Sequence, residues 1–447
     1  MARSLKGSPA QALCGATLGF FFGFAAVALF GPTAARLQQV MGLSPMAVGF
    51  LVAMPSLSGS LLRIPFAAWV ETTGGRKPFL VLLSLSTVGM AGLTAVALWV
   101  YPEGLTAAWY PGLLALGMLC GCGIATFSVG IGQVSYWCPQ RKQGRALAIY
   151  AGLGNVAPGV FTLVLPFALT RWGLAPCYVA WFLMLLAGTA LYTLMGRNAW
   201  YFQLRSQGAP EAEARREAAV LGQELFPASS LAESLRRSAR NAKTWALVFI
   251  YFTTFGGFIA LTAWLPTYYT QYYGLSPLLA GGLAGVFSLL CSLIRVGGGV
   301  LADKLREGGE NTAILALLVL LSGTLVMINA TRYEMAVPGE ILMAFGMGVA
   351  NAAIFKIVPQ VAPRAVGGAS GWVGGLGAFG GFAIPPVLAF AVRDLGKAGY
   401  AIGFIVFVFL TLGSLTMAWI LKYSDRIEPA PPSLTQPTQS LASQQYE

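Results

Sequence analysis

The chain has 447 residues, of which 56% are hydrophobic and only 10% are charged, with a formal net charge of +12. A soluble domain is about 25% charged, so the composition excludes an ordinary soluble protein and indicates an integral membrane protein. There is no histidine, and the six cysteines include one C-x-C pair, Cys120 and Cys122, with no second pair. We therefore expect small packing residues rather than a metal site, and no cofactor.

Twelve apolar stretches, taken in chain order, are long enough to cross a bilayer as helices, which needs about 20 residues. They lie at 10–32, 46–70, 79–101, 108–136, 146–170, 174–195, 244–268, 276–301, 311–330, 335–357, 366–392 and 398–421. The pattern predicts an all-α membrane protein with twelve transmembrane helices in two pseudo-symmetric six-helix bundles.

The expected organisation follows from where the polar stretches fall. An N-terminal bundle covers residues 1–196, a central loop covers 197–243, and a C-terminal bundle covers 244–424. The tail over 425–447 is rich in Pro, Ser, Thr and Gln and is expected to be disordered. In the loop, Ser230 and Glu233 form a capping box that predicts a short helix. Basic residues there would hold it near anionic lipid, and a solvated linker is the alternative.

Most of the 28 lysines and arginines fall in alternate loops, including the central one. The positive-inside rule then places both termini and the central loop in the cytoplasm. The predicted location is the cytoplasmic (inner) membrane, with the lipid bilayer as the surrounding partner. The basic balance reflects this orientation, so no nucleic-acid partner is expected.

An internal repeat is the most informative motif. Residues 42–64 and 274–296 share GLSP followed by S-L-x-x-S-L-x-R, so that Arg63 and Arg295 occupy matching positions. Such self-similarity indicates a duplication. A charge held at membrane depth usually faces a cavity and marks a substrate pathway. The two arginines therefore predict one central site for an anion.

An acid follows each of these arginines after eight positions, and basic residues follow the acid. The first copy has Glu71 and Arg76, and the second has Asp303 and Arg306. An acid at a helix end next to a basic turn can form an ion pair that locks the cytoplasmic side. The alternative is that the basic residues serve only as topology signals.

Glycine-rich segments form a second repeated feature, one in the fifth apolar stretch and one in the eleventh. Glycine permits close backbone contact between helices, or the approach of a substrate to the backbone. Plain helix packing is the alternative reading. The signature positions are Gly152, Gly154, Gly159, Gly371, Gly375 and Gly377.

Together these features resemble the major facilitator superfamily over roughly residues 10 to 425, and more specifically the nitrate/nitrite porter family. The resemblance rests on the two glycine signatures, the paired arginines and the segment YFTTFG that begins at Tyr251. It implies that Arg63 and Arg295 hold nitrate or nitrite. It also implies that Phe127, Tyr251 and Phe255 flank the planar anion, with Asn155 nearby. Ordinary helix packing is the alternative for these aromatic residues.

The predicted function is nitrate and nitrite transport in nitrate assimilation by alternating access, in a protein that works as a monomer. Exchange of nitrate for nitrite is favoured because the arginines cannot lose their charge at physiological pH. Proton-coupled uptake would need a titrating group, and the candidates are Glu340 and Lys356, although Lys356 can also be a snorkelling lysine. A porter for another small anion and a non-transporting sensor are the alternatives. No nucleophile–base pair or phosphate loop is present, so an enzyme is not expected.

Overall fold

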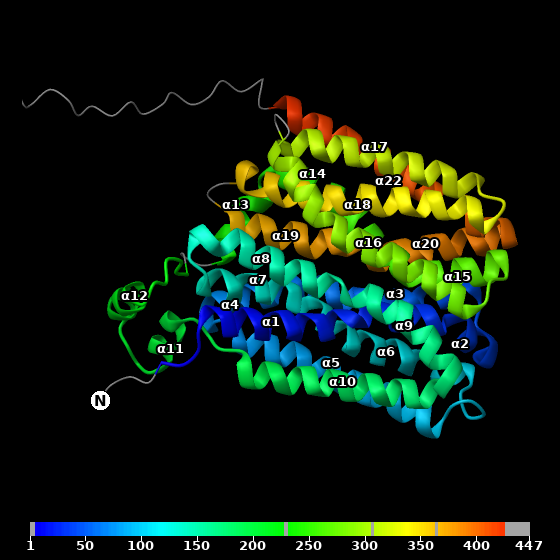
Figure 1. The fold of residues 1–447 in the computed structure, drawn as a ribbon, viewed down its shortest axis with the longest axis horizontal. Coiled ribbons are helices and arrows are strands. Elements are labelled where there is room, and N and C mark those ends of the chain that lie inside the picture. Colours follow the sequence, from blue (N-terminus) through cyan, green and yellow to red (C-terminus); the bar gives the residue numbers. More distant parts are fainter. Residues whose placement is uncertain (1–4, 228–230, 305–307, 363–364, 425–447) are drawn as a thin grey trace, which may run out of the picture.

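The computed structural model describes residues 5–227, 231–304, 308–362 and 365–424, and every element in these ranges is helical (Figure 1). The described residues contain twelve helices long and apolar enough to cross a membrane, which confirms the predicted all-α membrane fold. They are Pro9–Met41, Pro45–Thr73, Arg76–Trp99, Ala107–Trp137, Ile149–Trp172, Leu174–Met195, Ala242–Tyr273, Pro277–Ala302, Gly309–Asn329, Tyr333–Val358, Gly367–Ile402 and Ile405–Tyr423. The predicted tail lies outside the described residues.

Several of these spans consist of more than one helical element. Below, the spans up to Met195 are called the amino-terminal half and those from Ala242 the carboxy-terminal half. The amino-terminal half contains α1 (Pro9–Phe24), η1 (Ala25–Ala28), η2 (Gly31–Thr33), α2 (Ala34–Met41), α3 (Pro45–Leu61), α4 (Arg63–Thr73), α5 (Arg76–Trp99), α6 (Tyr110–Gly121), η4 (Cys122–Ala125), α7 (Thr126–Trp137), α8 (Gln140–Asn155), α9 (Ala157–Trp172) and α10 (Leu174–Met195).

The carboxy-terminal half begins with one span in three parts, of which the middle one is a π-helix. Its elements are α14 (Ala242–Tyr251), η5 (Phe252–Gly256), α15 (Gly257–Tyr273), α16 (Pro277–Lys304), α17 (Gly308–Asn329), α18 (Tyr333–Val361), α19 (Val366–Ala378), α20 (Gly380–Leu395), α21 (Gly399–Ile402) and α22 (Ile405–Ser424).

The repeated GLSP motif begins a helix in both halves. Gly42 and Gly274 end the preceding helices in left-handed conformations with φ of 64° and 71°, which glycine adopts without strain. Ser44 then accepts the backbone N–H of Ala47 at 3.2 Å, and Ser276 accepts that of Leu279 at 3.3 Å. Each serine caps its helix, and the proline that follows fits the first turn, where its missing N–H has no cost. The same four residues therefore produce the same start in each half.

Interruptions of the spans fall near the predicted site. Arg63 is the first residue of α4, directly after the break from α3 at Leu62, and Asn155 is the last residue of α8. The π-helix η5 contains Phe255. A π-helix is rare and is frequent at functional sites, because the wider turn re-aims side chains.

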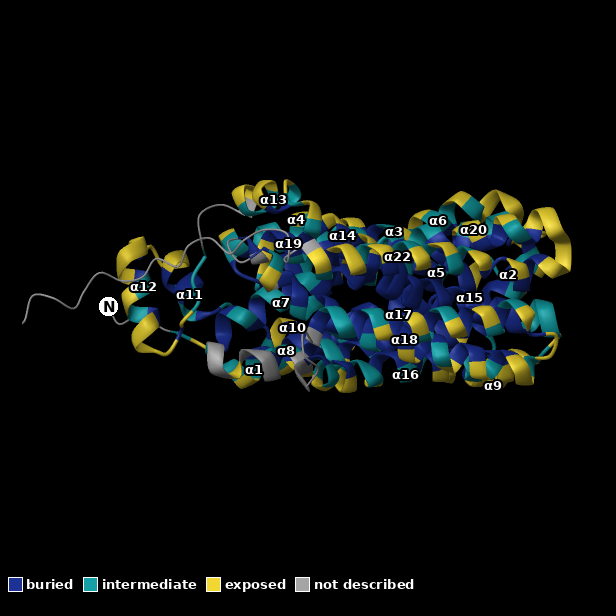
Figure 2. Ribbon diagram, turned by 90° about the horizontal axis from the view of Figure 1, so that it is seen from above, coloured by how far each residue is buried: buried dark blue, intermediate teal, exposed yellow. Residues whose placement is uncertain are grey.

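The two halves pack against each other most closely at the end of the molecule opposite α13 (Figures 1 and 2). There α3 lies along α20, and α9 lies along α16. Glycines make this possible: a Cβ at Gly49 would lie 2.5 Å from that of Ala389, and one at Gly281 would lie 2.2 Å from Cγ of Pro166. This contact, called the seam below, leaves no room for a side chain at these two glycines.

Three further helices connect the halves: α11 (Trp200–Ser206), α12 (Glu211–Val220) and α13 (Leu231–Ala239). The helix α13 begins where the capping box predicts a helix, although Ser230 itself lies outside the described residues. It packs against α19, where Ser234 accepts the backbone N–H of Gly368 at 3.0 Å, and Trp372 donates to the carbonyl of Leu235 at 3.1 Å. The α13 part of the linker is thus attached to the carboxy-terminal half, whereas Gln203 in α11 is hydrogen-bonded to Lys6 before the first span.

Candidate anion-binding site

Arg63 is a completely buried guanidinium between the two halves. Its Nε donates to the carbonyl of Gly59, one turn earlier, at 3.1 Å, and its Nη1 donates to the carbonyl of Gly374 in α19 at 3.0 Å. Its Nη2 is buried, and no described residue accepts from it. A buried charge is stable only when it is paired and hydrogen-bonded. Arg63 is therefore held in place by two hydrogen bonds, while the N–H groups of Nη2 have no described partner.

Aromatic rings surround both arginines. The Arg63 Cζ lies 4.9 Å from the centroid of the Phe127 ring and 5.3 Å from that of Phe255. The Arg295 Cζ lies 5.8 Å from the same Phe255 ring. Each contact is a cation–π interaction, worth about 0.5–2 kcal/mol depending on desolvation. The structure thus places both repeat-related arginines beside one ring, that of Phe255.

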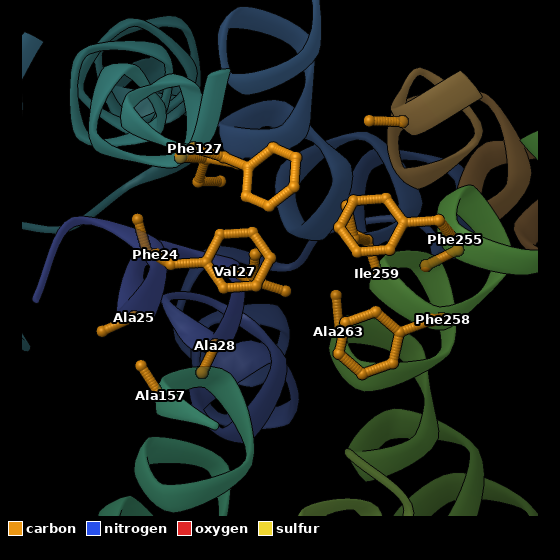
Figure 3. Close-up of a cluster of buried hydrophobic side chains, with 14 of the residues drawn as sticks. Phe24, Ala25, Val27, Ala28, Phe127, Ala157, Phe255, Phe258, Ile259 and Ala263 are labelled. Carbon is orange, nitrogen blue, oxygen red and sulfur yellow. The ribbon is translucent and has the colours of Figure 1, made fainter. Parts of the chain in front are cut away.

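Two of the rings face each other across the interior (Figure 3). The centroids of Phe127 in α7 and Phe255 in η5 are 6.3 Å apart, with an angle of 30° between the ring planes. Tyr251 also stacks on Phe255, with 4.8 Å between the ring centroids and 8° between the ring planes, and its side chain lies next to Arg295. All three predicted aromatic residues therefore belong to one cluster with the arginines.

Asn155 lies at the contact between the two halves. Its backbone carbonyl accepts a hydrogen bond from Ser292 in α16 at 2.8 Å. Its side chain is 1% exposed, and neither amide atom has a hydrogen-bond partner among the described residues. A buried amide with unused donors and acceptors is rare in native proteins. Asn155 therefore stays a candidate contact for a polar ligand.

Two aromatic residues of this cluster were not predicted. Phe24 at the end of α1 stacks on Phe255 at 6.4 Å, and Phe355 in α18 lies 5.8 Å from the Arg295 Cζ (Figure 3 shows Phe24). The repeat contained a signal for Phe355, because Ala353-Ile-Phe355 matches Ala125-Thr-Phe127. Each arginine thus lies over the phenylalanine of its own half. No comparable motif marks Phe24.

The signature glycines make different contacts. A Cβ at Gly154 would lie 1.9 Å from the Phe20 ring, and one at Gly377 would lie 2.7 Å from the Tyr251 ring, both within one half. A Cβ at Gly159 would lie 2.8 Å from the Leu289 side chain, and one at Gly375 would lie 2.7 Å from that of Ile64. In both cases the two residues belong to different halves of the molecule. The remaining two have more room: the nearest atom to a Cβ at Gly371 is 3.5 Å away, and Gly152 has no neighbour within 4 Å among the described residues.

The predicted gating residues make other contacts in this conformation. Glu71 accepts a hydrogen bond from the hydroxyl of Tyr136, and Arg76 donates to the carbonyl of Thr193 at 3.1 Å. Both residues are described, and they form no ion pair with each other. The Asp303 side chain and the whole of Arg306 lie outside the part of the chain that the structure describes.

The two candidate coupling residues lie at opposite ends of α18. Glu340 is 3% exposed and accepts a hydrogen bond from Tyr269, whereas Lys356 donates to the carbonyl of Ala302 at 2.6 Å. The helical rise separates Glu340 from Phe355 by about 22 Å. Glu340 is therefore outside the arginine cluster, and Lys356 binds a helix end. Within the described ranges, no group of three or more His, Cys, Asp or Glu side chains could hold a metal ion.

Comparisons with known proteins agree with this architecture. A "Probable nitrate/nitrite antiporter NarK1" of Thermus thermophilus is 29% identical over 428 residues, which cover 90% of this chain and 89% of that protein. A "Nitrite extrusion protein" of Bacillus subtilis (strain 168) is 27% identical over 412 residues, covering 92% and 94%.

Solved structures show the same fold at low identity. The partially occluded, inward-open xylose transporter XylE of E. coli matches with a TM-score of 0.69 and 14% identity over 95% of this chain and 100% of that one. The human organic anion transporter MFSD10 matches with a TM-score of 0.66 and 17% identity over 92% and 100%. The sequence profile of the Major Facilitator Superfamily matches residues 16–385. The chain therefore belongs to the Major Facilitator Superfamily, a family of multi-pass membrane transporters rather than enzymes.

Proposed function

We propose that this protein exchanges nitrate and nitrite across the cytoplasmic membrane by alternating access. The observation that carries the proposal is the Arg63 guanidinium, which is completely buried between Phe127 and Phe255 and whose Nη2 has no described hydrogen-bond partner. The names of the two bacterial relatives, a nitrate/nitrite antiporter and a nitrite extrusion protein, support the choice of anions.

The geometry of the site suits a small, flat oxyanion. A guanidinium is planar and presents donors in a fixed fork that matches two oxygens. A flat anion in van der Waals contact with both rings needs about 7 Å between them, and the Phe127 and Phe255 centroids are 6.3 Å apart. A small widening of this gap would admit nitrate or nitrite between the rings, with an edge facing Arg63.

The fixed charges favour exchange over uniport. Arginine side chains carry a fixed positive charge, and among the described residues no carboxylate pairs with Arg63 or Arg295. An unloaded carrier would carry both charges through the low-dielectric barrier, which is unfavourable, and a bound anion lowers that cost. Each half-cycle then runs best with an anion in the site.

The orientation follows from the positive-inside rule. The α13 end would face the cytoplasm, with both chain termini, and the glycine seam of α3 with α20 and of α9 with α16 would close the outer side. Rocking of the two halves about the arginine cluster would expose the site to each side in turn. One chain contains the complete site, so the protein would work as a monomer.

Proton-coupled nitrate uptake is the second candidate, and the buried Glu340 favours it. An ionisable group inside a membrane span is a functional candidate by default, and its described hydrogen-bond partner is Tyr269. Because Glu340 is far from the arginines, coupling would have to act through α15 and α18 rather than through contact with the anion.

Flux in proteoliposomes tests the proposal. Purified protein is reconstituted into vesicles loaded with nitrite, nitrate, chloride or no permeant anion, and nitrate uptake is followed. Fast uptake only with internal nitrite or nitrate supports exchange. Equal uptake into chloride-loaded vesicles would indicate a less selective anion porter, and absence of nitrate and nitrite flux in every condition would refute the proposed substrates.

A further inference from the structure

Asn351 is a buried amide in α18 that the proposed cycle does not use. Its side chain is 2% exposed, and no described residue donates a hydrogen bond to its Oδ1. Buried polar atoms in native proteins are nearly always hydrogen-bonded, so each exception requires an explanation. The explanation for this one lies in its neighbours.

Asn351 lies in the middle of the face of α18 that packs on the π-helix span. One turn before it, Cε of Met347 lies 2.8 Å from the position of a Cβ at Gly257. One turn after it, the Phe355 ring meets the Tyr251 ring edge-on at 5.2 Å and 85°. Residues four apart share a helix face. The Asn351 side chain therefore projects toward the segment that carries Tyr251 and Phe255.

Arg295 approaches the same place from α16. Its Cζ lies 5.8 Å from the centroids of both Phe255 and Phe355. Arg63 is held by two backbone carbonyls, whereas in the described ranges no backbone carbonyl accepts from Arg295. A guanidinium has five donors and no acceptor. Arg295 thus has donors to spare, and Asn351 has an acceptor to spare, beside the same ring.

We propose that Asn351 Oδ1 accepts a hydrogen bond from the Arg295 guanidinium when an anion is bound, and so aims the other Arg295 donors at the anion. This assignment rests on the proposed anion transport. It makes Asn351 a positioning residue and the counterpart, for Arg295, of the carbonyls that hold Arg63. An amide suits this task because it accepts a hydrogen bond without neutralising the charge that attracts the anion.

The first test removes the acceptor while keeping the volume. In Asn351→Leu, nitrate affinity measured by isothermal titration calorimetry on the purified full chain should fall about tenfold, the loss of one hydrogen bond to a charged group. The melting temperature should be unchanged or higher, because an unpaired buried polar atom has been removed. Met347→Leu on the same face is the matched control, with affinity within twofold of the parent.

The second test adds a charge at the same position. In Asn351→Asp, a carboxylate would pair with Arg295 and cancel its charge, so nitrate binding should be lost while the protein still folds. In an Arg295→Lys background, Asn351→Leu should cost less than twofold, because the partner is already gone. A full tenfold loss of nitrate affinity in that background would contradict the pairing of Asn351 with Arg295. If Arg295→Lys binds nitrate too weakly to measure, the single variants Asn351→Leu and Asn351→Asp decide the question.

The outcomes separate the two proposals. If the parent protein binds neither nitrate nor nitrite, the proposed function fails. If the parent binds nitrate and Asn351→Leu binds it within twofold, the role of Asn351 is wrong and the proposed function stands. A lower melting temperature with unchanged affinity would show that Asn351 only contributes to packing.

Discussion

At the scale of single residues, the two repeat-related arginines are not equivalent. Arg63 is completely buried and donates to carbonyls in both halves, whereas Arg295 is half-buried and lies against the faces of Phe255 and Phe355. The duplication supplied the same residue twice, and the surrounding backbone then gave each copy its own environment. Arg63 is thus held by two backbone hydrogen bonds, and in the proposed cycle Arg295 would be the arginine that moves with the anion.

This asymmetry predicts different consequences for the two Arg→Lys variants. Lysine has a single nitrogen in place of the planar fork. In Arg63→Lys that nitrogen cannot donate to the carbonyls of Gly59 and Gly374 and also to an anion with the geometry of the arginine. We expect Arg63→Lys to weaken nitrate binding by about 10- to 100-fold, as for one or two lost charged hydrogen bonds, and to lower the melting temperature. Arg295→Lys should weaken binding with little change in melting temperature. Calorimetry measures the nitrate affinity, and thermal unfolding measures the melting temperature. An equal fall in melting temperature in the two variants would contradict the predicted asymmetry.

The aromatic contacts predict a graded effect of ring removal. Phe127→Ala and Phe255→Ala each remove a ring that lies within 5.3 Å of the Arg63 Cζ, a cation–π contribution of about 0.5–2 kcal/mol. Phe255 also contacts Arg295, so its loss should reduce nitrate affinity more than the loss of Phe127. Phe50→Ala, at an exposed ring outside the cluster, is the control. Unchanged affinity in both cluster variants would show that these rings only fill space.

At the scale of elements, the glycine-rich segments have two separate structural roles. Gly154 and Gly377 give room to aromatic rings within one half, whereas Gly159 and Gly375 let the halves approach each other. The backbone of the second segment also takes part in the site, because the carbonyl of Gly374 accepts from Arg63. One glycine-rich stretch thus allows close helix packing and also supplies a carbonyl that holds Arg63.

Adding a methyl group separates these roles. In Gly377→Ala the new Cβ would lie 2.7 Å from the Tyr251 ring and must displace it, so nitrate affinity should fall. In Gly159→Ala the new Cβ would meet Leu289 at 2.8 Å across the seam, so the exchange rate should fall with affinity nearly unchanged. Gly152→Ala meets no described atom within 4 Å and is the control. Nitrate flux and nitrate affinity are measured for each variant. A loss of affinity alone in both Gly377→Ala and Gly159→Ala would contradict the two separate roles.

At the scale of the whole molecule, two halves meet around a positively charged centre that is closed off at one end. The seam opposite α13 is packed through glycines, while α13 itself is attached to α19 of the carboxy-terminal half. Opening that seam requires the halves to separate along α3 with α20 and along α9 with α16. The arginine cluster lies between the halves, so in the proposed cycle anion binding would be linked to their separation.

This linkage predicts exchange that is independent of a proton gradient. Internal nitrite should accelerate nitrate uptake at least several-fold over empty vesicles, and an inward proton gradient alone should have little effect, because the arginine cluster keeps its charge. Glu340→Gln should retain exchange if the buried acid is only structural. Rapid proton-driven uptake into anion-free vesicles that is lost in Glu340→Gln would instead establish symport through Glu340.

The sequence by itself determined the membrane fold, because spanning length and apolar composition are local properties of each segment. It also identified Arg63, Arg295, Phe127, Tyr251 and Phe255 as one group, through the repeat and the family resemblance. The starts of α3 and α16 are also determined locally, because the serine of each GLSP motif caps the helix that follows it.

Only the tertiary structure decided which atoms of these residues meet. Three features depend on how the helices rotate and pack against each other. They are the hydrogen bond from Arg63 to Gly374, the π-helix that contains Phe255, and the burial of Asn351 one turn before Phe355. In a membrane span every face is apolar, so hydropathy cannot specify that rotation. Close approach through glycines and the need to pair each buried polar group set it instead.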